Sequence, residues 1–552
     1  MMQYTHILTL VIAGALLWGP GGLASQAQAS PPDAAEVRRI FAPPPGSLSV
    51  GATGGGRLER AHEIPLKGPG WAFLPIVRPR GTNFGTEEMA GLLRRVAARV
   101  AADFPGARLG VGNVSLAEGG RSRWHASHQA GRDVDILMFS TDSRGRSVNP
   151  TRFFGFGADG KSRDGRFHFD AKRNLSLVEA LVTDPEVGIQ WIFVSDELKA
   201  RLLAAAAERG RPTETIERLS QVLHQPTDAL PHDDHFHVRL FCSPEDRRYG
   251  CLDFGPFWAW VDRGDAAFEA RVADLVRVMA VKDNATRLKA IRTLADIRAR
   301  SAVPALLASL EDTDDGIRDG SLRALRTIGD PAALPALLAL LARTPDPAFA
   351  AKLFSAMLAL PTQAVLDVAR GYLSAPGRYL HPGLAATDPL EFRTATTRVL
   401  ARYGRIEVVP ELLALLAAPS ADLRRAAHEA LIRVTNIVPD APSPTSSSLA
   451  ARTQAAWQQL WNKHKAEPWS AWLRRGFDAA GYRLKPDLSD PASIEVLIEA
   501  TGDSRPHIAQ NAVRLLSDLT GHVVDPRSRP PARQRRHWQY WWSRHLSGDS
   551  TD

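Results

Sequence analysis

The stretch HASHQAGRDVD, His125–Asp135, brings together side chains that bind metals or move protons. A glycine at position 131 allows the chain to turn between the two histidines and the two aspartates. The β-branched residues that follow predict a strand, in which residues two apart share a face. Asp133 and Asp135 are therefore both able to point towards His128, and the spacing alone does not choose between them.

A second cluster, HDDHFHVRL, begins at His232. Its HFH segment has strand character, so His235 and His237 share a face. Together, the two clusters would supply histidine and aspartate ligands for one metal ion, and some of the histidines would remain unbound. Three protein ligands and one open position are typical of a catalytic zinc, whereas a structural zinc has four ligands. We therefore expect one metal site, in which an unused histidine acts as base or oxyanion donor; His235 as a fourth ligand would make the site structural.

Two other kinds of catalysis fit the sequence less well. A Ser/His/Asp site is disfavoured because no G-x-S-x-G turn is present, and Ser127 lies in no recognisable nucleophile turn. A Cys/His site is excluded if the two cysteines, Cys242 and Cys251, are paired. A disulfide between them suits an exported protein, and two buried thiols are the alternative.

The N-terminus is typical of a secretory signal over residues 1–29. An apolar run at 7–18 is too short for a membrane span, and Ala27-Gln28-Ala29 gives a cleavage pattern. The first six residues contain no Lys or Arg, so a retained anchor is the alternative. We expect a periplasmic protein with no membrane span once the signal is removed.

The formal net charge of +8 favours anionic partners such as a cell-wall polymer. We do not expect nucleic-acid binding, because no zinc-finger, RNA-recognition or basic-zipper pattern occurs. The arginines are scattered through Ala/Leu-rich helical segments, where they solvate the outer faces.

Residues 30–262 are predicted to form an α+β domain, a small central antiparallel sheet with flanking helices. Helical patterns cover 87–104, 196–210 and 213–223, and strand patterns cover 134–139, 187–194 and 235–242.

From residue 268 the composition shifts to Ala, Leu and Arg, and an internal repeat begins. VPALLASL (303–310), LPALLALL (334–341) and VPELLALL (409–416) are near copies, each with a proline where a helix would start. The first two lie about thirty residues apart, the length of a two-helix repeat. The pattern resembles HEAT-like repeats and predicts an all-α solenoid over 268–435. A Pro/Ser-rich linker at 436–450 and a further helical repeat region at 451–552 follow.

Two Trp-rich segments lie in that last region. Trp457 and Trp461 are four residues apart, as are Trp538 and Trp542, so each pair lies on one helix face. We expect them to cap the apolar end of the solenoid; a sugar-stacking or partner surface is the alternative.

HASHQAGRDVDI and HDDHFHVRLFC resemble the two signature segments of the penicillin-insensitive murein endopeptidases. PPGSLSVG, IPLKGPGW, NFG and GNVSLAEGGR precede them in the order of that family. The resemblance covers about residues 40–255 and none of the repeats. It implies an exported zinc peptidase that cuts the D-alanyl–meso-diaminopimelate cross-link of peptidoglycan and is insensitive to penicillin. A zinc D,D-carboxypeptidase and a non-catalytic murein-binding scaffold are the alternatives.

Carried over residue by residue, the resemblance implies that one Zn²⁺ is bound by His128, Asp135 and His237. It makes His235 the catalytic base or electrostatic partner, and it matches His125 and His232 to two further active-site histidines. The helical repeats would bind an envelope protein partner or position the enzyme.

The resemblance also matches Cys242 to a disulfide-bonded position, with Cys251 as its natural partner. Two departures stand out. A further cysteine that the family carries near GATGGGRL (51–58) is absent, so we expect the N-terminal strap to be held by other contacts. Arg132 replaces an apolar residue, which would alter the rim of the site.

Overall fold

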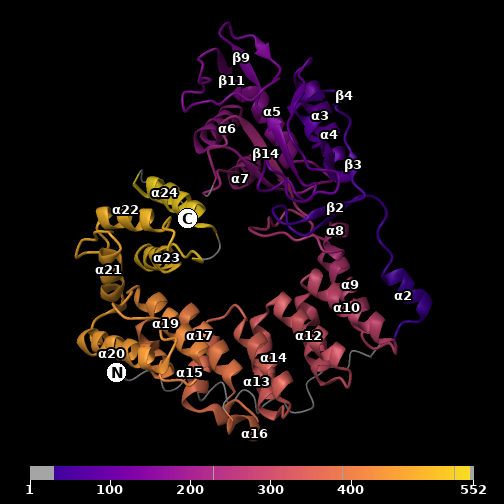
Figure 1. The fold of residues 1–552 in the computed structure, drawn as a ribbon. Coiled ribbons are helices and arrows are strands. Elements are labelled where there is room, and N and C mark those ends of the chain that lie inside the picture. Colours follow the sequence, from indigo (N-terminus) through magenta and orange to yellow (C-terminus); the bar gives the residue numbers. More distant parts are fainter. Residues whose placement is uncertain (1–29, 228, 388, 527–528, 547–552) are drawn as a thin grey trace.

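The chain forms an α+β domain and a helical arc that curves back to meet it (Figure 1). This computed structural model describes residues 30–227, 229–387, 389–526 and 529–546. The signal sequence predicted at 1–29 lies outside the described residues.

A seven-stranded sheet forms the centre of the α+β domain. In spatial order its strands are β13 (Leu223–His224), β12 (Ile189–Phe193), β14 (His235–Leu240), β8 (Asp133–Leu137), β7 (Leu109–Val111), β5 (Trp71–Phe73) and β4 (Lys67–Gly68). The predicted antiparallel sheet is confirmed at the centre, where β12, β14, β8 and β7 are antiparallel neighbours. Two pairs nearer the edges, β12 with β13 and β5 with β7, are parallel.

The two faces of β14 carry different side chains because residues alternate along a strand. Phe236, Val238 and Leu240 are fully buried in the apolar core of the domain. His235 and His237 point to the opposite face. In the pairing of β14 with β8, His237 lies directly opposite Asp135. The strand register alone therefore brings the two clusters of the sequence together.

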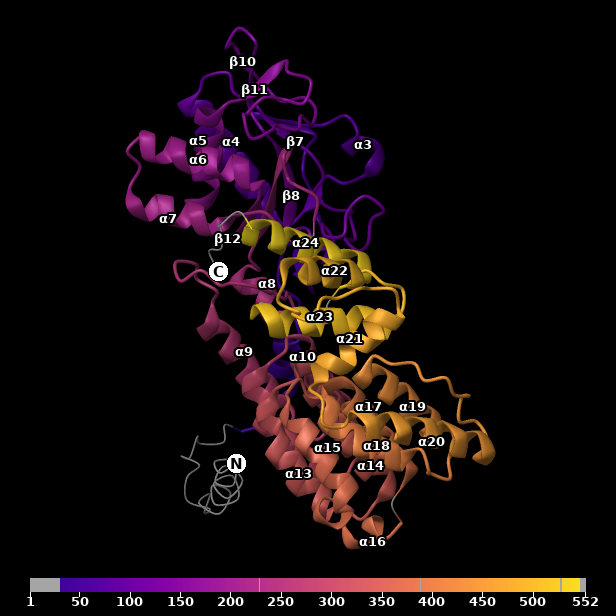
Figure 2. The same ribbon diagram turned by 90° about the vertical axis from the view of Figure 1, so that its left-hand side faces the viewer.

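Helices pack along one side of this sheet (Figure 2). They are α4 (Glu87–Asp103), α5 (Ala171–Val182), α6 (Asp196–Glu208) and α7 (Thr213–Val222). The boundaries of α4, α6 and α7 agree with the predicted helices to within two residues. The amphipathic α4 buries Leu92, Leu93 and Val96, and such a stripe stabilises a helix chiefly through its packing.

Smaller elements complete this domain. They are β1 (Leu48–Val50) with β2 (Arg57–Glu59), β3 (His62–Glu63) with β6 (Phe84–Gly85), and β9 (Ser140–Asp142) with β10 (Ser147–Val148) and β11 (Phe167–Phe169). The short helices are α2 (Ala34–Ile40), α3 (Val77–Arg80) and α8 (Pro244–Arg248).

The rest of the described chain is helical, as predicted. The helices are α9 (Asp265–Val278), α10 (Asn284–Asp296), α11 (Val303–Ala308), α12 (Asp315–Ile328), α13 (Leu334–Arg343), α14 (Pro347–Leu358), α15 (Ala364–Ser374), α16 (Pro382–Ala385), α17 (Leu390–Tyr403), α18 (Val409–Leu415), α19 (Ala421–Thr435), α20 (Ser447–His464), α21 (Trp469–Ala479), α22 (Pro491–Ala500), α23 (Pro506–Thr520) and α24 (Pro531–Leu546). None of the helices among these described residues is long and apolar enough to cross a membrane.

The repeated prolines mark helix starts, as predicted. Pro304, Pro335 and Pro410 lie in the first turns of α11, α13 and α18, and a single 3₁₀ turn precedes each helix. Proline fits there because the first N–H groups of a helix have no partner within it. The leucines that follow, such as Leu306 and Leu337, are buried in one continuous core.

The Trp-rich helices contribute to cores. Trp457 of α20 packs against the core of the repeats and donates through Nε1 to His428 at 3.0 Å. Trp538 of α24 is fully buried in a separate core with α21, α22 and α23. The first tryptophan of each pair therefore packs in a helical core, and the capping role stays a prediction.

The Pro/Ser-rich segment between α19 and α20 is a loop that is bound to its neighbours. The buried Arg424 donates to the carbonyls of Pro444 and Thr445. The hydroxyl of Thr453 donates to the carbonyl of Pro442 at 2.6 Å. The segment therefore connects two packed helices and does not behave as a free tether.

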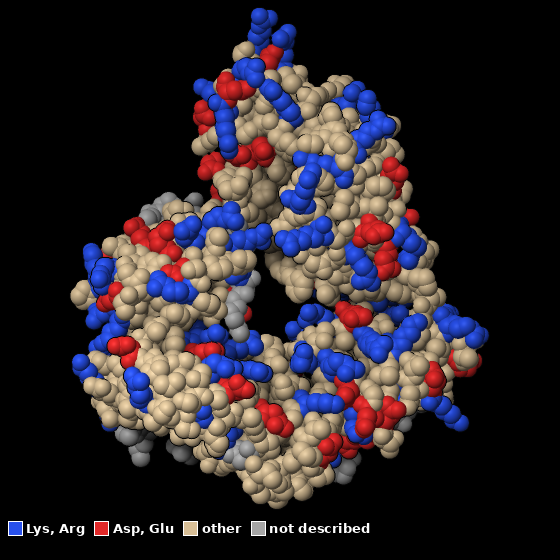
Figure 3. Space-filling view, in the orientation of Figure 1, with Lys and Arg blue, Asp and Glu red and all other residues tan. Residues whose placement is uncertain are grey.

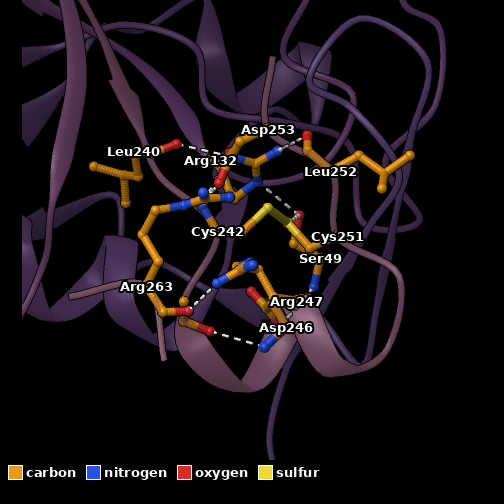
Figure 4. The surroundings of a disulfide bond; sticks show 11 residues. Ser49, Arg132, Leu240, Cys242, Asp246, Arg247, Cys251, Leu252, Asp253 and Arg263 are labelled. Carbon is orange, nitrogen blue, oxygen red and sulfur yellow. Dashed lines mark hydrogen bonds and ion pairs between the residues drawn. A yellow bond between two sulfur atoms is a disulfide. The ribbon is translucent and has the colours of Figure 1, made fainter. Parts of the chain in front are cut away.

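A disulfide joins Cys242 and Cys251, as predicted, with the Cα atoms 5.8 Å apart. The expectation that Arg132 alters the rim of the metal site is wrong. Its side chain is buried beside this disulfide, where it pairs with Asp253 at 2.9 Å and donates to Ser49 and to the carbonyl of Leu240 (Figure 4). Several acceptors compensate its buried charge.

The N-terminal strap is held at the same corner without a second disulfide. Gly51 donates to the carbonyl of Gly250 at 2.8 Å, and Leu252 donates back to Gly51 at 3.0 Å. The backbone N–H of Ser49 donates to the Asp246 carboxylate at 3.2 Å. Main-chain pairing thus takes the place of the absent cysteine.

The pKa of Asp246 makes stability depend on pH. Burial and the nearby Glu88 carboxylate raise this pKa to about 7. The folded state therefore holds a proton that the unfolded state, with a pKa near 3.8, has already lost, so stability falls as pH rises from about 4 to 7. Between pH 5 and pH 8 we expect the free energy of unfolding of the wild type to fall, relative to that of Asp246→Asn, by on the order of 1–3 kcal/mol.

Urea unfolding of the oxidised protein at both pH values measures this difference. Asp164→Asn is the matched control, because the pKa of this exposed carboxyl is lowered to about 2 and it does not titrate in that range. Equal pH dependence of all three proteins would contradict the prediction.

Candidate metal centre

His128 reaches the cluster from an irregular loop before β8. Its backbone is left-handed, with φ 62°, a region that few residues other than glycine adopt. Gly131 follows with φ 72°, and a Cβ there would lie 2.9 Å from the Leu58 side chain, so this turn requires glycine. The Nδ1 atom of His128 contacts the carbonyl of Val114 at 2.7 Å. This hydrogen bond requires a proton on Nδ1 and turns Nε2 towards Asp135.

Asp135 lies at the floor of the cluster. Its Oδ1 atom is 3.2 Å from His128 Nε2, 3.6 Å from His237 Nδ1 and 3.4 Å from His235 Nε2. Burial raises the pKa of Asp135, but His128 and His235 outweigh this effect and hold the pKa well below its usual range. The carboxylate is therefore ionised and can bind a cation.

Asp133 points to the same face but is engaged by other groups. Arg239 donates to both of its oxygens, at 2.8 and 2.9 Å. Its Oδ2 atom also accepts the backbone N–H of His128 at 3.2 Å and lies 3.3 Å from His237 Nε2. A carboxylate behind a ligand histidine orients the ring and increases its basicity. Asp133 is thus suited to hold His237, while Asp135 remains open.

Four buried atoms of the cluster have no hydrogen-bond partner among the described residues: Nε2 of His128, Oδ1 of Asp135, Nδ1 of His232 and Nε2 of His237. The first two face each other at 3.2 Å. Buried polar atoms are almost always paired, so this pair of donor atoms fits a bound cation. Both side chains are only 2% exposed, whereas those of His125 and His235 are 22% and 19% exposed. The cluster therefore has a buried floor and an accessible rim.

Three overlapping groups of side chains have ligand atoms within 4.8 Å of one another. They are His125, His128 and Asp135; His128, Asp133 and His237; and His232, His235 and His237. The predicted union of the two sequence clusters is confirmed, because every histidine of both clusters belongs to this one assembly. Nitrogen and carboxylate oxygen donors without cysteine suit zinc and other divalent transition metals.

The histidines at the rim differ in charge. Burial lowers the pKa of His125 to about 4 and that of His232 to about 3, and neighbouring histidines add to both shifts. Burial also lowers the pKa of His235, but the carboxylates of Asp135 and Asp234 reverse the effect and raise it to about 10. His125 and His232 are therefore neutral near pH 7, while His235 holds a proton when Asp135 carries no cation.

The sequence analysis missed the groups that orient these rings. Asn113 contacts His125 Nε2 at 2.8 Å, and Asp234 contacts His235 Nδ1 at 2.5 Å. Phe193 lies beside His237 with ring centroids 5.1 Å apart. The HDDH spacing could have indicated Asp234, because it adjoins a candidate base. No local sequence pattern indicated that Phe193 would lie beside a histidine of the cluster.

Comparison with protein families matches residues 49–280 to the family described as penicillin-insensitive murein endopeptidase. Residues 272–357 match the HEAT repeats. The first match contains the whole histidine and aspartate cluster. The second confirms the repeat type in the first part of the helical arc.

Curated proteins named penicillin-insensitive murein endopeptidase align with this chain. The protein of Haemophilus influenzae is 30% identical over 245 residues, which cover 44% of this chain and 79% of that protein. The protein of Klebsiella pneumoniae is 29% identical over 240 residues, 42% and 78% of the two chains. An Escherichia coli protein is 28% identical over 214 residues, 38% and 72% of the two chains.

We predict that Asp133→Asn weakens Zn²⁺ binding about 10–100-fold, the usual effect of removing a carboxylate behind a ligand histidine. The neutral amide would no longer orient the His237 ring or neutralise Arg239. Competition with a chromophoric chelator measures the affinity, and circular dichroism checks the fold. Asp142→Asn, at an exposed turn, is the control. Unchanged affinity in Asp133→Asn would contradict a role for Asp133 behind the metal.

Proposed function

The chain belongs to the penicillin-insensitive murein endopeptidase family, and we propose that it is an exported zinc peptidase that hydrolyses the D-alanyl–meso-diaminopimelate cross-links of peptidoglycan. The observation that carries this proposal is the convergence of His128, Asp135 and His237 beneath an accessible rim of neutral histidines. Neither a D,D-carboxypeptidase nor a non-catalytic scaffold is favoured by the family.

We assign His128, Asp135 and His237 as the zinc ligands. In this assignment the Val114 carbonyl orients His128 and the Asp133 carboxylate orients His237. Bound Zn²⁺ would lower the pKa of a coordinated water to about 7 and polarise the scissile carbonyl. With three protein ligands, one position would remain for that water, which is typical of catalytic zinc sites.

His235 acts as the general base in this proposal. Asp234 holds its Nδ1 atom, so Nε2 faces the cluster. The Asp135 carboxylate is one of the two groups that raise the pKa of His235. Its charge would be shared with a bound Zn²⁺, so the imidazole would hold its proton less tightly. His235 can then accept the proton of the attacking water and return it to the leaving amine.

His125 and His232 stabilise the oxyanion in this proposal. As neutral rings they can donate an N–H to the developing negative charge. Nδ1 of His232 is buried without a hydrogen-bond partner among the described residues. Its backbone is fixed, because its N–H donates to Gln225 at 2.9 Å and its carbonyl accepts from Ser195 at 2.8 Å.

The periplasm is the proposed location. The substrate lies in the cell envelope, and the Cys242–Cys251 disulfide suits an oxidising compartment. The predicted signal sequence would direct export. No acyl-enzyme forms in this mechanism, so β-lactams, which trap a nucleophilic serine, do not inhibit.

Digestion of purified cross-linked muropeptide dimers tests the proposal. We expect the wild type to yield monomers, with loss of activity in His128→Ala and with a chelator, and no effect of penicillin. Mass spectrometry identifies the products. Dimers shortened by one terminal D-alanine would indicate a carboxypeptidase. Intact dimers in the presence of bound zinc would indicate a scaffold.

His235→Gln separates catalysis from metal binding. We expect kcat to fall about 10²–10⁴-fold, the usual contribution of a general base, with the zinc content unchanged. His62→Gln in the small β3–β6 sheet is the control. Loss of zinc together with activity would instead make His235 a ligand, and the site structural.

A further inference from the structure

The last helix of the repeats, α24, lies against the catalytic domain (Figures 1 and 2). His537 Nδ1 is 2.6 Å from the Thr227 hydroxyl, and Tyr540 donates a hydrogen bond to Asp196. Thr227 lies in the loop that begins at Gln225, whose side chain holds the backbone of His232. The helical arc is thus fastened next to a loop that carries a rim histidine.

Helix α24 also borders the loop that carries the other rim histidine. A cavity of about 830 Å³ lies between them, lined by Arg121, Arg123, Trp124, His125 and Gln129 from the catalytic domain and by Arg533 from α24. His125 Nε2 lies 3.9 Å from Asp135 Oδ2. The cavity therefore begins at the metal cluster and extends to the repeats.

This cavity is positively charged. Three arginines line it and no Asp or Glu does. Among the described residues, no acidic side chain forms an ion pair with Arg121, Arg123 or Arg533. Arg80 and Arg123 each lie 4.9 Å from the ring of Trp124, which adds a flat surface with positive charge. Lys and Arg side chains are also visible around the opening enclosed by the arc (Figure 3).

Guanidinium groups without an acidic partner are suited to bind carboxylates, through two parallel hydrogen bonds. The stem peptides of peptidoglycan carry free carboxylates close to the cross-link. A stem peptide with its scissile bond at the cluster would pass His125 and enter this cavity.

We propose that the cavity is a subsite for a stem-peptide carboxylate and that Arg533, supplied by the helical repeats, completes it. The inference rests on the proposed function, because it takes the substrate from there. Arg533 lies far beyond residues 49–280, the segment matched to the endopeptidase family. The repeats thereby contribute directly to substrate selection.

The test uses the full chain and two muropeptide dimers, one with free carboxyls and one with these carboxyls amidated. We expect Arg533→Ala to raise KM for the free dimer about tenfold, the effect of losing one partly exposed charge-assisted hydrogen bond, with kcat little changed. Its KM for the amidated dimer should equal that of the wild type. Arg533→Lys should recover part of the loss, because it keeps the charge.

Arg535→Ala is the matched control. This arginine lies two residues further along α24 and faces Glu499 of α22 at 3.4 Å, away from the cavity. The proposal is overturned if Arg533→Ala and Arg535→Ala behave alike, or if Arg533→Ala affects both dimers equally.

Binding without hydrolysis separates this inference from the proposed function. Isothermal titration calorimetry of the full chain measures the binding of a free stem pentapeptide and of its amidated form. If the wild type cleaves no dimer, the proposed function fails, yet tighter binding of the free peptide that Arg533→Ala abolishes would still support a carboxylate site. Equal binding of both peptides by wild type and variant would overturn the site itself.

Discussion

The pairing of β14 with β8 is the constraint on which the site depends. It places His237 opposite Asp135 and Arg239 opposite Asp133. A shift by one residue would turn every side chain of the strand to the other face. The core prevents this shift, because Phe236 and Val238 are fully buried on the opposite face. The hydrophobic packing beneath the sheet therefore fixes the geometry of the polar cluster above it.

Polar contacts behind the cluster determine which atoms face inwards. The Val114 carbonyl and the Asp234 carboxylate hydrogen-bond one nitrogen of His128 and of His235, and the Asp133 carboxylate lies 3.3 Å from Nε2 of His237. The other nitrogen of each ring faces the cluster. Burial keeps the rim histidines neutral, while carboxylates raise the pKa of His235. The histidines thus acquire different pKa values from their surroundings, and catalytic proton transfer requires groups whose pKa values differ.

The helical arc has a structural role that its sequence did not reveal. Each repeat buries its apolar face against its neighbours, so the arc can extend without contacting the catalytic domain. Its curvature nevertheless brings α24 back to that domain, beside the loops of His125 and His232. A segment more than 300 residues from those loops thereby borders the site.

The sequence by itself determined the chemistry and the local structure. Residue types and their spacing predicted one histidine and aspartate site, the disulfide, the strands that carry the ligands and the proline-marked repeats. Each cluster, strand and helix start depends on neighbours along the chain, and alternation or helical periodicity records it directly. The joining of the two clusters was inferred from their ligand chemistry, and the pairing of β14 with β8 brings it about. Residue spacing left Asp133 and Asp135 as alternatives, and the family resemblance pointed to Asp135. Only the tertiary structure gave the physical reason, because Arg239 holds Asp133 and leaves Asp135 open. It also buried Arg132 beside the disulfide and returned α24 to the catalytic domain. These outcomes depend on contacts between distant segments, and no local pattern specifies which distant groups will meet.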